Sequence, residues 1–169
     1  YLRLARALCD RYSVHLVVDE IAVGFGRTGS LFAHQQAGIR PDFICLSKGL
    51  TGGTLPLSAV LTTDAVYAAF YDDDAARGFL HSHSYTGNPL ACRAAVATLE
   101  LFEQLDALNA NIALAQHIDT ACAPLTHHPR VRHARRLGMI WAWDVDTPLP
   151  DFSRRYHQHA MARGLVLRP

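Results

Sequence analysis

The 169-residue sequence contains a single lysine, and several features of common protein classes are missing as well. The formal net charge is only +1, so the chain lacks the basic surplus of a nucleic-acid-binding or membrane-surface domain. No apolar run approaches the roughly 20 residues needed to cross a bilayer. The four cysteines are scattered without a CxxC pair, which excludes a dense disulfide framework and favours reduced thiols in a cytosolic protein.

The scarcity of lysine draws attention to the one that is present. All 16 basic residues are arginine except Lys48. A chain that otherwise uses arginine, whose guanidinium stays protonated, indicates that position 48 needs an amine. Composition alone does not distinguish this interpretation from a surface lysine that occurs at position 48 by chance.

Half of the residues are hydrophobic and 18% are charged, which predicts a packed globular core. Helical periodicity over 1–11 is followed by apolar runs at 14–18, 43–46 and 58–62, the pattern of an α/β protein with a mainly parallel sheet. Further helices are expected at 64–71, 89–105, 107–124 and 152–163, and further strands at 138–145 and 165–167. Because the chain starts inside a predicted helix and stops inside a predicted strand, we expect it to be a piece of a longer protein.

Two glycine patterns suggest nucleotide binding, and neither has the right context. Gly24, Gly26 and Gly29 form GxGxxG after a strand, but no helix opens at the third glycine and no acid follows at the expected distance. The hypothesis of a nicotinamide-dependent oxidoreductase therefore rests on the GxGxxG spacing alone. Three further glycines follow Lys48 instead of preceding it, which is not the order of a phosphate-binding P-loop.

The histidine pairs at 81 and 83 and at 127 and 128 could suggest a metal. None has the spacing of HExxH or a nearby cysteine. We expect hydrogen bonds to the backbone or solvent from these rings, and no metal site.

Asp19 ends one predicted strand, and Lys48 follows the next one along the sheet. Ligands of open α/β sheets gather at the carboxyl ends of the strands. Pyridoxal phosphate needs these two groups, an amine for a Schiff base and a carboxylate that keeps the pyridine nitrogen protonated. The amine can then carry a proton to and from the substrate Cα.

The surrounding residues resemble a known family. The run 18–29 (VDEIAVGFGRTG), followed by Pro41-Asp42 and 46–50 (LSKGL), is similar to the signature of class III, fold type I, aminotransferases. The runs 50–54, 57–63 and 81–92 most resemble the branch of that class that acts in biotin biosynthesis. The likeness is strong over 1–105 and weaker over 138–169.

The resemblance implies a role for five residues toward pyridoxal 5'-phosphate. Asp19 would bind the pyridine nitrogen, Lys48 would form the Schiff base, and Ile21 would pack on a ring face. His83 and Ser84 would reach the phosphate from the neighbouring subunit of a homodimer. The family commonly has Pro-Thr at these two positions, so the contact of His83 would depend on its backbone.

The resemblance also implies substrate contacts. Ser82 would line the pocket, and Arg27 and Arg168 match two active-site arginines, with Arg168 suited to grip a carboxylate bidentately. The substrates implied are S-adenosylmethionine as donor, with lysine as a known variation, and 8-amino-7-oxononanoate as acceptor. For Arg27, a structural ion pair with Glu20 or Asp42 remains the alternative.

By this resemblance, residues 1–105 are the second half of the cofactor-binding large domain, and 106–169 are a connecting helix and part of a small α+β domain. The phosphate loop and the ring-stacking aromatic of the family would lie upstream, so we expect this piece alone to be inactive. Two alternatives stay open: an ω-aminotransferase acting on ornithine, 4-aminobutyrate or a polyamine, and a non-catalytic homologue.

Overall fold

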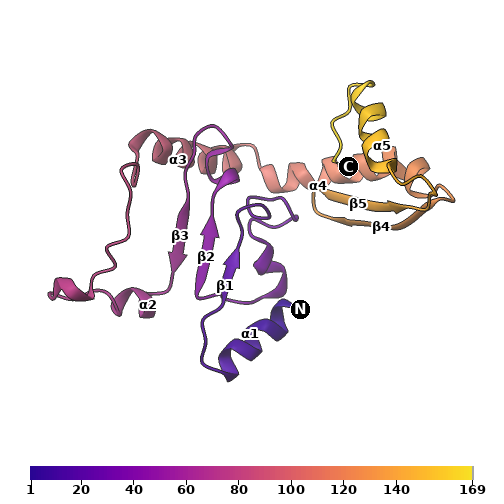
Figure 1. Ribbon diagram of the computed structural model, residues 1–169. Helices are drawn as coiled ribbons and strands as arrows, with labels where there is room; N and C mark the ends of the chain where they lie inside the picture. Colours follow the sequence, from indigo (N-terminus) through magenta and orange to yellow (C-terminus); the bar gives the residue numbers. More distant parts are fainter. Residues whose placement is uncertain (169) are drawn as a thin grey trace. The chain divides into compact units, whose positions relative to one another are not determined.

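The computed structural model describes residues 1–168, which form two compact units (Figure 1). Unit 1 comprises residues 1–118 and 137–140, and unit 2 comprises residues 119–136 and 141–168. No helix among the described residues is long and apolar enough to cross a membrane. The four cysteines, all of which are described, form no disulfide.

Unit 1 contains a three-stranded sheet in the order β1 (Val17–Asp19), β2 (Phe43–Leu46), β3 (Ala59–Thr62). β1 and β2 are parallel, with Asp19 opposite Cys45, whereas β3 is antiparallel to β2. In Figure 1, β1 and β2 therefore point toward one end of the sheet and β3 points away from it. The expected α/β architecture is confirmed, and β1 lies later in the sequence than predicted, so that it includes Asp19.

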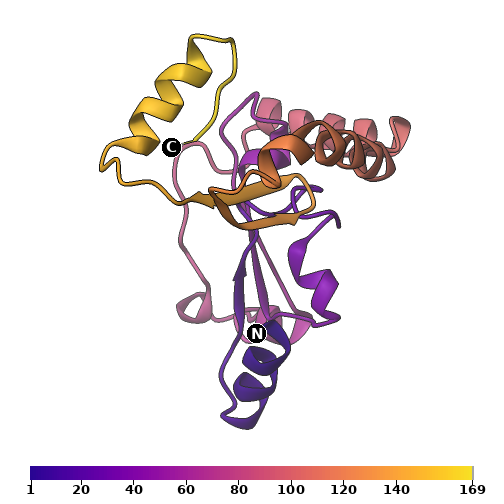
Figure 2. The same cartoon turned by 90° about the vertical axis from the view of Figure 1, so that its right-hand side faces the viewer.

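Unit 1 also contains helices and helical turns. They are α1 (Leu2–Arg11), η1 (Ala33–Ala37), η2 (Lys48–Thr51), α2 (Asp64–Ala68), η3 (Ala75–Arg77), α3 (Pro89–Gln104) and the first part of α4 (Ala107–Thr126). The start of α3 follows from its sequence, because the Asn88 side chain accepts hydrogen bonds from the N–H groups of Leu90 and Ala91, and Pro89 needs no partner. Figure 2 shows α1 at the end of the sheet opposite to α3.

The hydrophobic core of unit 1 lies beside η2. Phe25, Leu46, Leu50 and Ala95 are its buried members, and partly buried side chains from β2, β3 and α3 pack around them. The core therefore packs against η2, the helical turn that follows β2 and begins at Lys48.

A polar cluster ties α1 to the strands. The Arg6 guanidinium donates to Asp42 Oδ2 at 2.7 Å, the Leu16 N–H donates to the same oxygen at 2.7 Å, and the His15 ring lies 3.8 Å from Asp42 Oδ1. The Arg6 hydrogen bond, and after it the Leu16 N–H, holds the pKa of the Asp42 carboxyl below its usual range. Asp42 thus has a structural role, because it joins α1 to the segment that leads into β1.

Unit 2 consists of the end of α4, most of a β-hairpin and a further helix. Its elements are β4 (Val131–Leu137), which pairs with β5 (Ile140–Val145), and α5 (Phe152–Met161). The strand expected over 138–145 starts two residues later, because Gly138, with φ of 56°, and Met139 make the hairpin turn. β4 was not predicted, since its sequence VRHARRL has no alternating apolar face and is almost wholly exposed.

The prediction of a strand at 165–167 is wrong for the described chain. Residues 165–168 have no regular secondary structure. The Leu165 N–H donates to the Ala160 carbonyl at 3.0 Å, and His157 Nδ1 lies 2.5 Å from the Leu167 carbonyl oxygen. The segment is therefore bonded back to α5, because within the described residues no strand pairs with it.

The Arg6–Asp42 pair predicts an acid-dependent loss of stability. The folded-state pKa of Asp42 is depressed, so its ionisation stabilises the fold above the ordinary Asp pKa of about 4, and this contribution disappears as pH falls through the folded-state value. In the full-length protein, Asp42→Asn should lower the midpoint of urea unfolding at pH 7, and the difference should vanish at low pH. Asp73→Asn, at an exposed acid, is the control; an Asp42→Asn deficit that persists at low pH would contradict the assignment.

Candidate active site

Asp19 and Lys48 lie at the same edge of the sheet. Asp19 is the last residue of β1, and Lys48 follows β2, its parallel neighbour, by two positions. Both residues are exposed. The Ile21 N–H donates to Asp19 Oδ1 at 2.9 Å, which orients the carboxylate, and no other hydrogen bond to its oxygens exists among residues 1–168. The strand order and register place both residues at the carboxyl ends of β1 and β2, as predicted, and their pairing as acid and amine of one site stays a prediction.

The acid next to Asp19 has a different task. Glu20 is only 2% exposed, because consecutive residues of extended chain point to opposite sides. Its carboxylate accepts hydrogen bonds from the N–H groups of Ala33 and His34, at 2.9 Å each, and lies 2.9 Å from His34 Nδ1. A buried carboxylate with these partners fixes the loop between β1 and η1.

Sequence reasoning did not find this role for Glu20. It considered Glu20 only as a partner for Arg27, and the alternation of an outward Asp19 with an inward Glu20 was the available signal. Arg27 is exposed, and among residues 1–168 it forms no ion pair with Glu20, Asp42 or any other acid. The structural ion pair considered for Arg27 is therefore wrong for this chain, and its substrate role stays a prediction.

Lys48 has an unusual backbone. It is the first residue of η2 and has a φ of 42°, in the left-handed region that side chains other than glycine rarely adopt. The turn is closed by hydrogen bonds from the Leu50 N–H to the Ser47 carbonyl and from the Gly53 N–H to the Lys48 carbonyl, at 2.9 and 3.2 Å. A strained lysine held by a tight turn is typical of a functional position.

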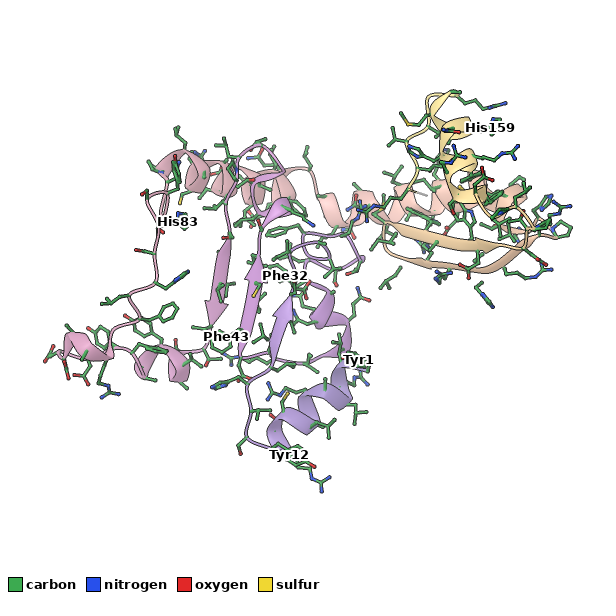
Figure 3. The ribbon with its side chains drawn as sticks, in the orientation of Figure 1. Tyr1, Tyr12, Phe32, Phe43, His83 and His159 are labelled. Atoms are coloured by element: carbon green, nitrogen blue, oxygen red, sulfur yellow. The ribbon has the colours of Figure 1, made fainter. Side chains whose placement is uncertain are left out.

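The predicted phosphate-contacting residues lie in a turn before α3, on the long connection that carries His83 in Figure 3. The His83 N–H donates to Thr86 Oγ1 at 3.0 Å, and His83 Nδ1 accepts from the Tyr85 N–H at 3.1 Å. Within the described chain, the N–H and hydroxyl of Ser84 make no hydrogen bond, and Ser82 is exposed beside it. Ser84 therefore offers two unused donors, whereas the backbone donor of His83 is engaged in the turn.

The other histidines singled out in the sequence also bond to backbone. His127 Nδ1 lies 2.7 Å from the Ala123 carbonyl oxygen, and His128 Nδ1 accepts from the Arg130 N–H at 3.2 Å. These rings serve local turns.

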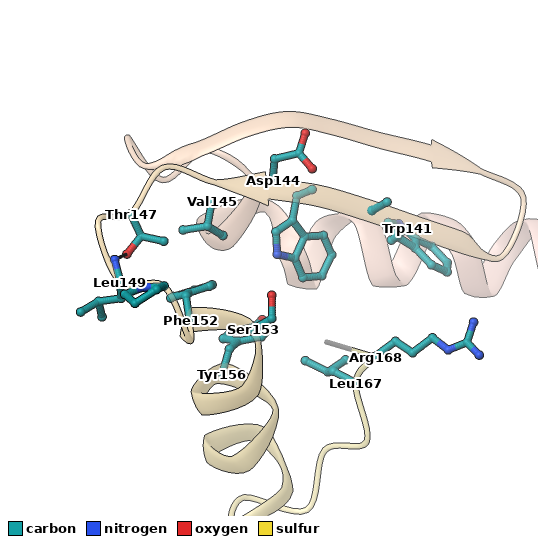
Figure 4. Close-up of a pocket in the computed structure, with 13 residues that line it drawn as sticks. Trp141, Asp144, Val145, Thr147, Leu149, Phe152, Ser153, Tyr156, Leu167 and Arg168 are labelled. Atoms are coloured by element: carbon teal, nitrogen blue, oxygen red, sulfur yellow. Dashed lines mark hydrogen bonds between the residues drawn. The ribbon is translucent and has the colours of Figure 1, made fainter.

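Arg168 belongs to unit 2. It lines a cavity of about 590 Å³ together with Trp141, Trp143 and Tyr156. Figure 4 shows its guanidinium pointing away from Ser153 and Tyr156. Its predicted role toward a substrate carboxylate stays a prediction.

Comparison with known proteins identifies the family to which a chain with this sheet edge, lysine and acid belongs. Residues 1–169 match the family model for class-III aminotransferases, and the chain belongs to this family. It spans 40% and 33% of the length of two curated relatives that it matches over its whole length.

Those relatives share one name. The chain is 46% identical, over its whole length and 40% of the relative, to adenosylmethionine-8-amino-7-oxononanoate aminotransferase of Helicobacter pylori. It is 50% identical to the protein of that name from Aquifex aeolicus, over 83% of this chain and 31% of the relative.

Solved structures agree with this similarity. The chain resembles the crystal structure of adenosylmethionine-8-amino-7-oxononanoate aminotransferase from Methanocaldococcus jannaschii with a TM-score of 0.90 and 32% identity, over 100% of this chain and 42% of that one. It also resembles taurine:2-oxoglutarate aminotransferase from Bifidobacterium kashiwanohense, solved in complex with PLP and glutamate, with a TM-score of 0.85 and 27% identity over 98% and 39% of the two chains.

The buried carboxylate of Glu20 predicts a large stability effect. Glu20→Ala leaves the donors of Ala33 and His34 without their acceptor, so the full-length protein should lose about 3 kcal/mol of unfolding free energy. Glu100→Ala, which removes an exposed ion pair with Arg93, is the matched control and should cost less than about 1 kcal/mol. Equal unfolding midpoints in urea for the two variants would show that Glu20 does not anchor the loop.

Proposed function

We propose that the full-length protein is a pyridoxal-phosphate-dependent aminotransferase that transfers an amino group from S-adenosylmethionine to 8-amino-7-oxononanoate, giving 7,8-diaminononanoate in biotin biosynthesis. The observation that carries the proposal is the placement of Asp19 and Lys48 at the ends of adjacent parallel strands. The names of the curated relatives support the choice of substrates.

The residues present fit the cofactor chemically. Asp19 has an exposed carboxylate with an oxygen free for a pyridinium N–H, and Lys48 has an exposed amine. Ser84 has an unused N–H and hydroxyl, the donor types that phosphate oxygens accept. When bound, pyridoxal phosphate supplies an electron sink that accepts the electrons of the substrate Cα–H bond.

The residues of this chain would then hold the cofactor and keep or move protons at the pyridine nitrogen and the substrate Cα. Asp19 would keep the pyridine nitrogen protonated by charge pairing. The Ile21 N–H, which donates to Asp19 Oδ1, holds that carboxylate in one orientation. Lys48 would hold the cofactor through its side-chain amine, and the same amine would move a proton to and from the substrate Cα. The Ile21 side chain, which is half-buried, would pack on a face of the ring.

The phosphate contact requires a second subunit in this proposal. Ser84, through its hydroxyl and N–H, would bind the phosphate held by the neighbouring copy, so the protein would be a homodimer. The His83 N–H is donated to Thr86, so the contact assigned to His83 would require that hydrogen bond to open.

Substrate contacts are assigned to three residues. We place Ser82 at the wall of the pocket, and Arg27 and Arg168 as cationic groups, with Arg168 on the acceptor's carboxylate. Residues 1–105 would then be the second half of the large domain, and 106–169 a connecting helix and part of the small domain, of a cytosolic enzyme.

One other function has specific support. The chain is also similar to a thermostable (S)-enantioselective omega-transaminase from Thermomicrobium roseum, with a TM-score of 0.85 and 28% identity over 99% of this chain and 39% of that one. The same Asp19 and Lys48 would serve an ω-aminotransferase acting on ornithine, 4-aminobutyrate or a polyamine.

A donor–acceptor assay separates these functions. The full-length protein with pyridoxal phosphate is given either 8-amino-7-oxononanoate or a simple keto acid as acceptor. S-adenosylmethionine, lysine, ornithine and 4-aminobutyrate are tested in parallel as donors, and the aminated acceptor is measured by mass spectrometry. We expect product with S-adenosylmethionine. Turnover only of ornithine or 4-aminobutyrate with simple keto acids would overturn the biotin-pathway assignment.

Replacement of the single lysine of this chain tests the proposed chemistry. Lys48→Arg keeps the positive charge but lacks a nucleophilic amine that can be neutral, so kcat should fall by at least on the order of 10²-fold. Circular dichroism and oligomeric state should be unchanged, because Lys48 is exposed. An Arg variant that keeps the unmodified kcat would exclude Lys48 as the reacting amine.

The proposed contact of Ser84 with the phosphate predicts an effect of its substitution on cofactor affinity. Ser84→Ala removes one charge-assisted hydrogen bond, so the Kd for pyridoxal phosphate in the full-length protein should rise about tenfold or more, while Ser84→Thr should bind almost normally. Ser58→Ala, at another exposed serine, is the control. If Ser84→Ala and Ser58→Ala have the same Kd, Ser84 does not contact the phosphate.

A further inference from the structure

Phe25 is an unusual member of the hydrophobic core. Its side chain is only 9% exposed, and its backbone has a φ of 55°, in the region disfavoured for residues with a side chain. The ring packs edge-on against Phe32 and Phe102, with centroid distances of 5.7 and 6.4 Å. A phenylalanine kept in this conformation is held firmly by its neighbours.

The same side chain fills the space beside Gly49. A Cβ atom on Gly49 would lie 2.9 Å from Phe25 Cβ and Cδ2 and 3.0 Å from Cγ, which is too close for carbon atoms. The φ of Gly49 is outside the left-handed region, so the close approach, and not the backbone conformation, requires glycine there. Phe25 thus presses directly on the peptide that follows Lys48.

Phe25 also belongs to the segment that carries the acid. The Gly24 N–H donates to the Glu20 carbonyl at 2.9 Å, so a single turn links the end of β1 to Phe25. A Cβ on Gly24 would lie 2.8 Å from that carbonyl oxygen, so the turn requires glycine at this position. One hydrogen-bonded turn therefore separates Asp19 from the residue that touches the Lys48 turn.

We propose that Phe25 is a positioning residue for Lys48: its contact with Gly49 holds the strained Lys48 backbone and so fixes the lysine amine relative to Asp19. The inference rests on the proposed function for its catalytic consequence, but not for the contact itself. A displacement of about 1 Å at a reacting group can cost on the order of 10²-fold in rate, so the contact has a measurable effect.

Substitutions at Phe25 separate positioning from core stability. Phe25→Leu keeps the Cβ, Cγ and Cδ atoms that face Gly49 and removes the distal ring, whereas Phe25→Ala removes the contact beyond Cβ. Phe102→Ala removes a ring from the same cluster and is the matched control, because the atoms closest to Gly49 all belong to Phe25. Gly49→Ala displaces the contact from the other side and keeps the test available if Phe25→Ala does not fold.

Two readouts are measured on the full-length protein. The first is the rate constant for acylation of Lys48 by an amine-selective reagent without cofactor, followed on its peptide by mass spectrometry. The second is the separation of kcat from KM in the donor–acceptor assay. We expect Phe25→Ala and Gly49→Ala to change the acylation rate and to lower kcat by roughly 10- to 100-fold at nearly constant KM. Phe25→Leu and Phe102→Ala should match the unmodified protein.

The outcomes distinguish the two proposals. Equal acylation rates and kcat for Phe102→Ala and Phe25→Ala, or an unaltered Gly49→Ala, would overturn the positioning role. Acylation rates that differ as expected in a protein with no aminotransferase activity would support the contact and overturn the proposed function alone.

Discussion

The parallel pairing of β1 with β2 is the constraint on which the candidate site depends. Their register sets Asp19 opposite Cys45, so the carboxylate and Lys48 leave the sheet at the same edge. A shift by one residue would turn Asp19 inward and Glu20 outward, because side chains alternate across a strand. The strand pairing thus selects which acid is available to a ligand and which is structural.

The loop that follows β1 supports both candidate site residues, Asp19 and Lys48. Glu20 anchors its far end through the N–H groups of Ala33 and His34, and Phe25, in its middle, packs against Gly49. The core beside η2 is therefore also the support of the lysine turn, so packing and function are coupled at one place. The GxGxxG spacing that resembles a dinucleotide fingerprint belongs to this loop, where its glycines allow tight turns next to Glu20.

The sequence sufficed to predict the sheet edge at which Asp19 and Lys48 lie, because short apolar runs alternating with helices imply parallel strands, as β1 and β2 are. The antiparallel direction of β3 did not follow from its apolar run. The sequence also did not reveal β4, whose arginine-rich strand is exposed on both sides and has no apolar alternation. It wrongly predicted a strand at 165–167, since apolar content does not supply a pairing partner. The role of Phe25 was also missed, because a left-handed backbone at a bulky residue results from tertiary packing and has no local signal.

The most direct test of this account is a crystal structure of the full-length protein with pyridoxal phosphate bound. The account predicts a covalent link from the cofactor to Lys48 Nζ and an Asp19 carboxylate oxygen about 2.7–2.9 Å from the pyridine nitrogen, the distance of a charge-assisted hydrogen bond. A cofactor bound to a different lysine, or a pyridine nitrogen out of hydrogen-bonding reach of Asp19, would contradict it.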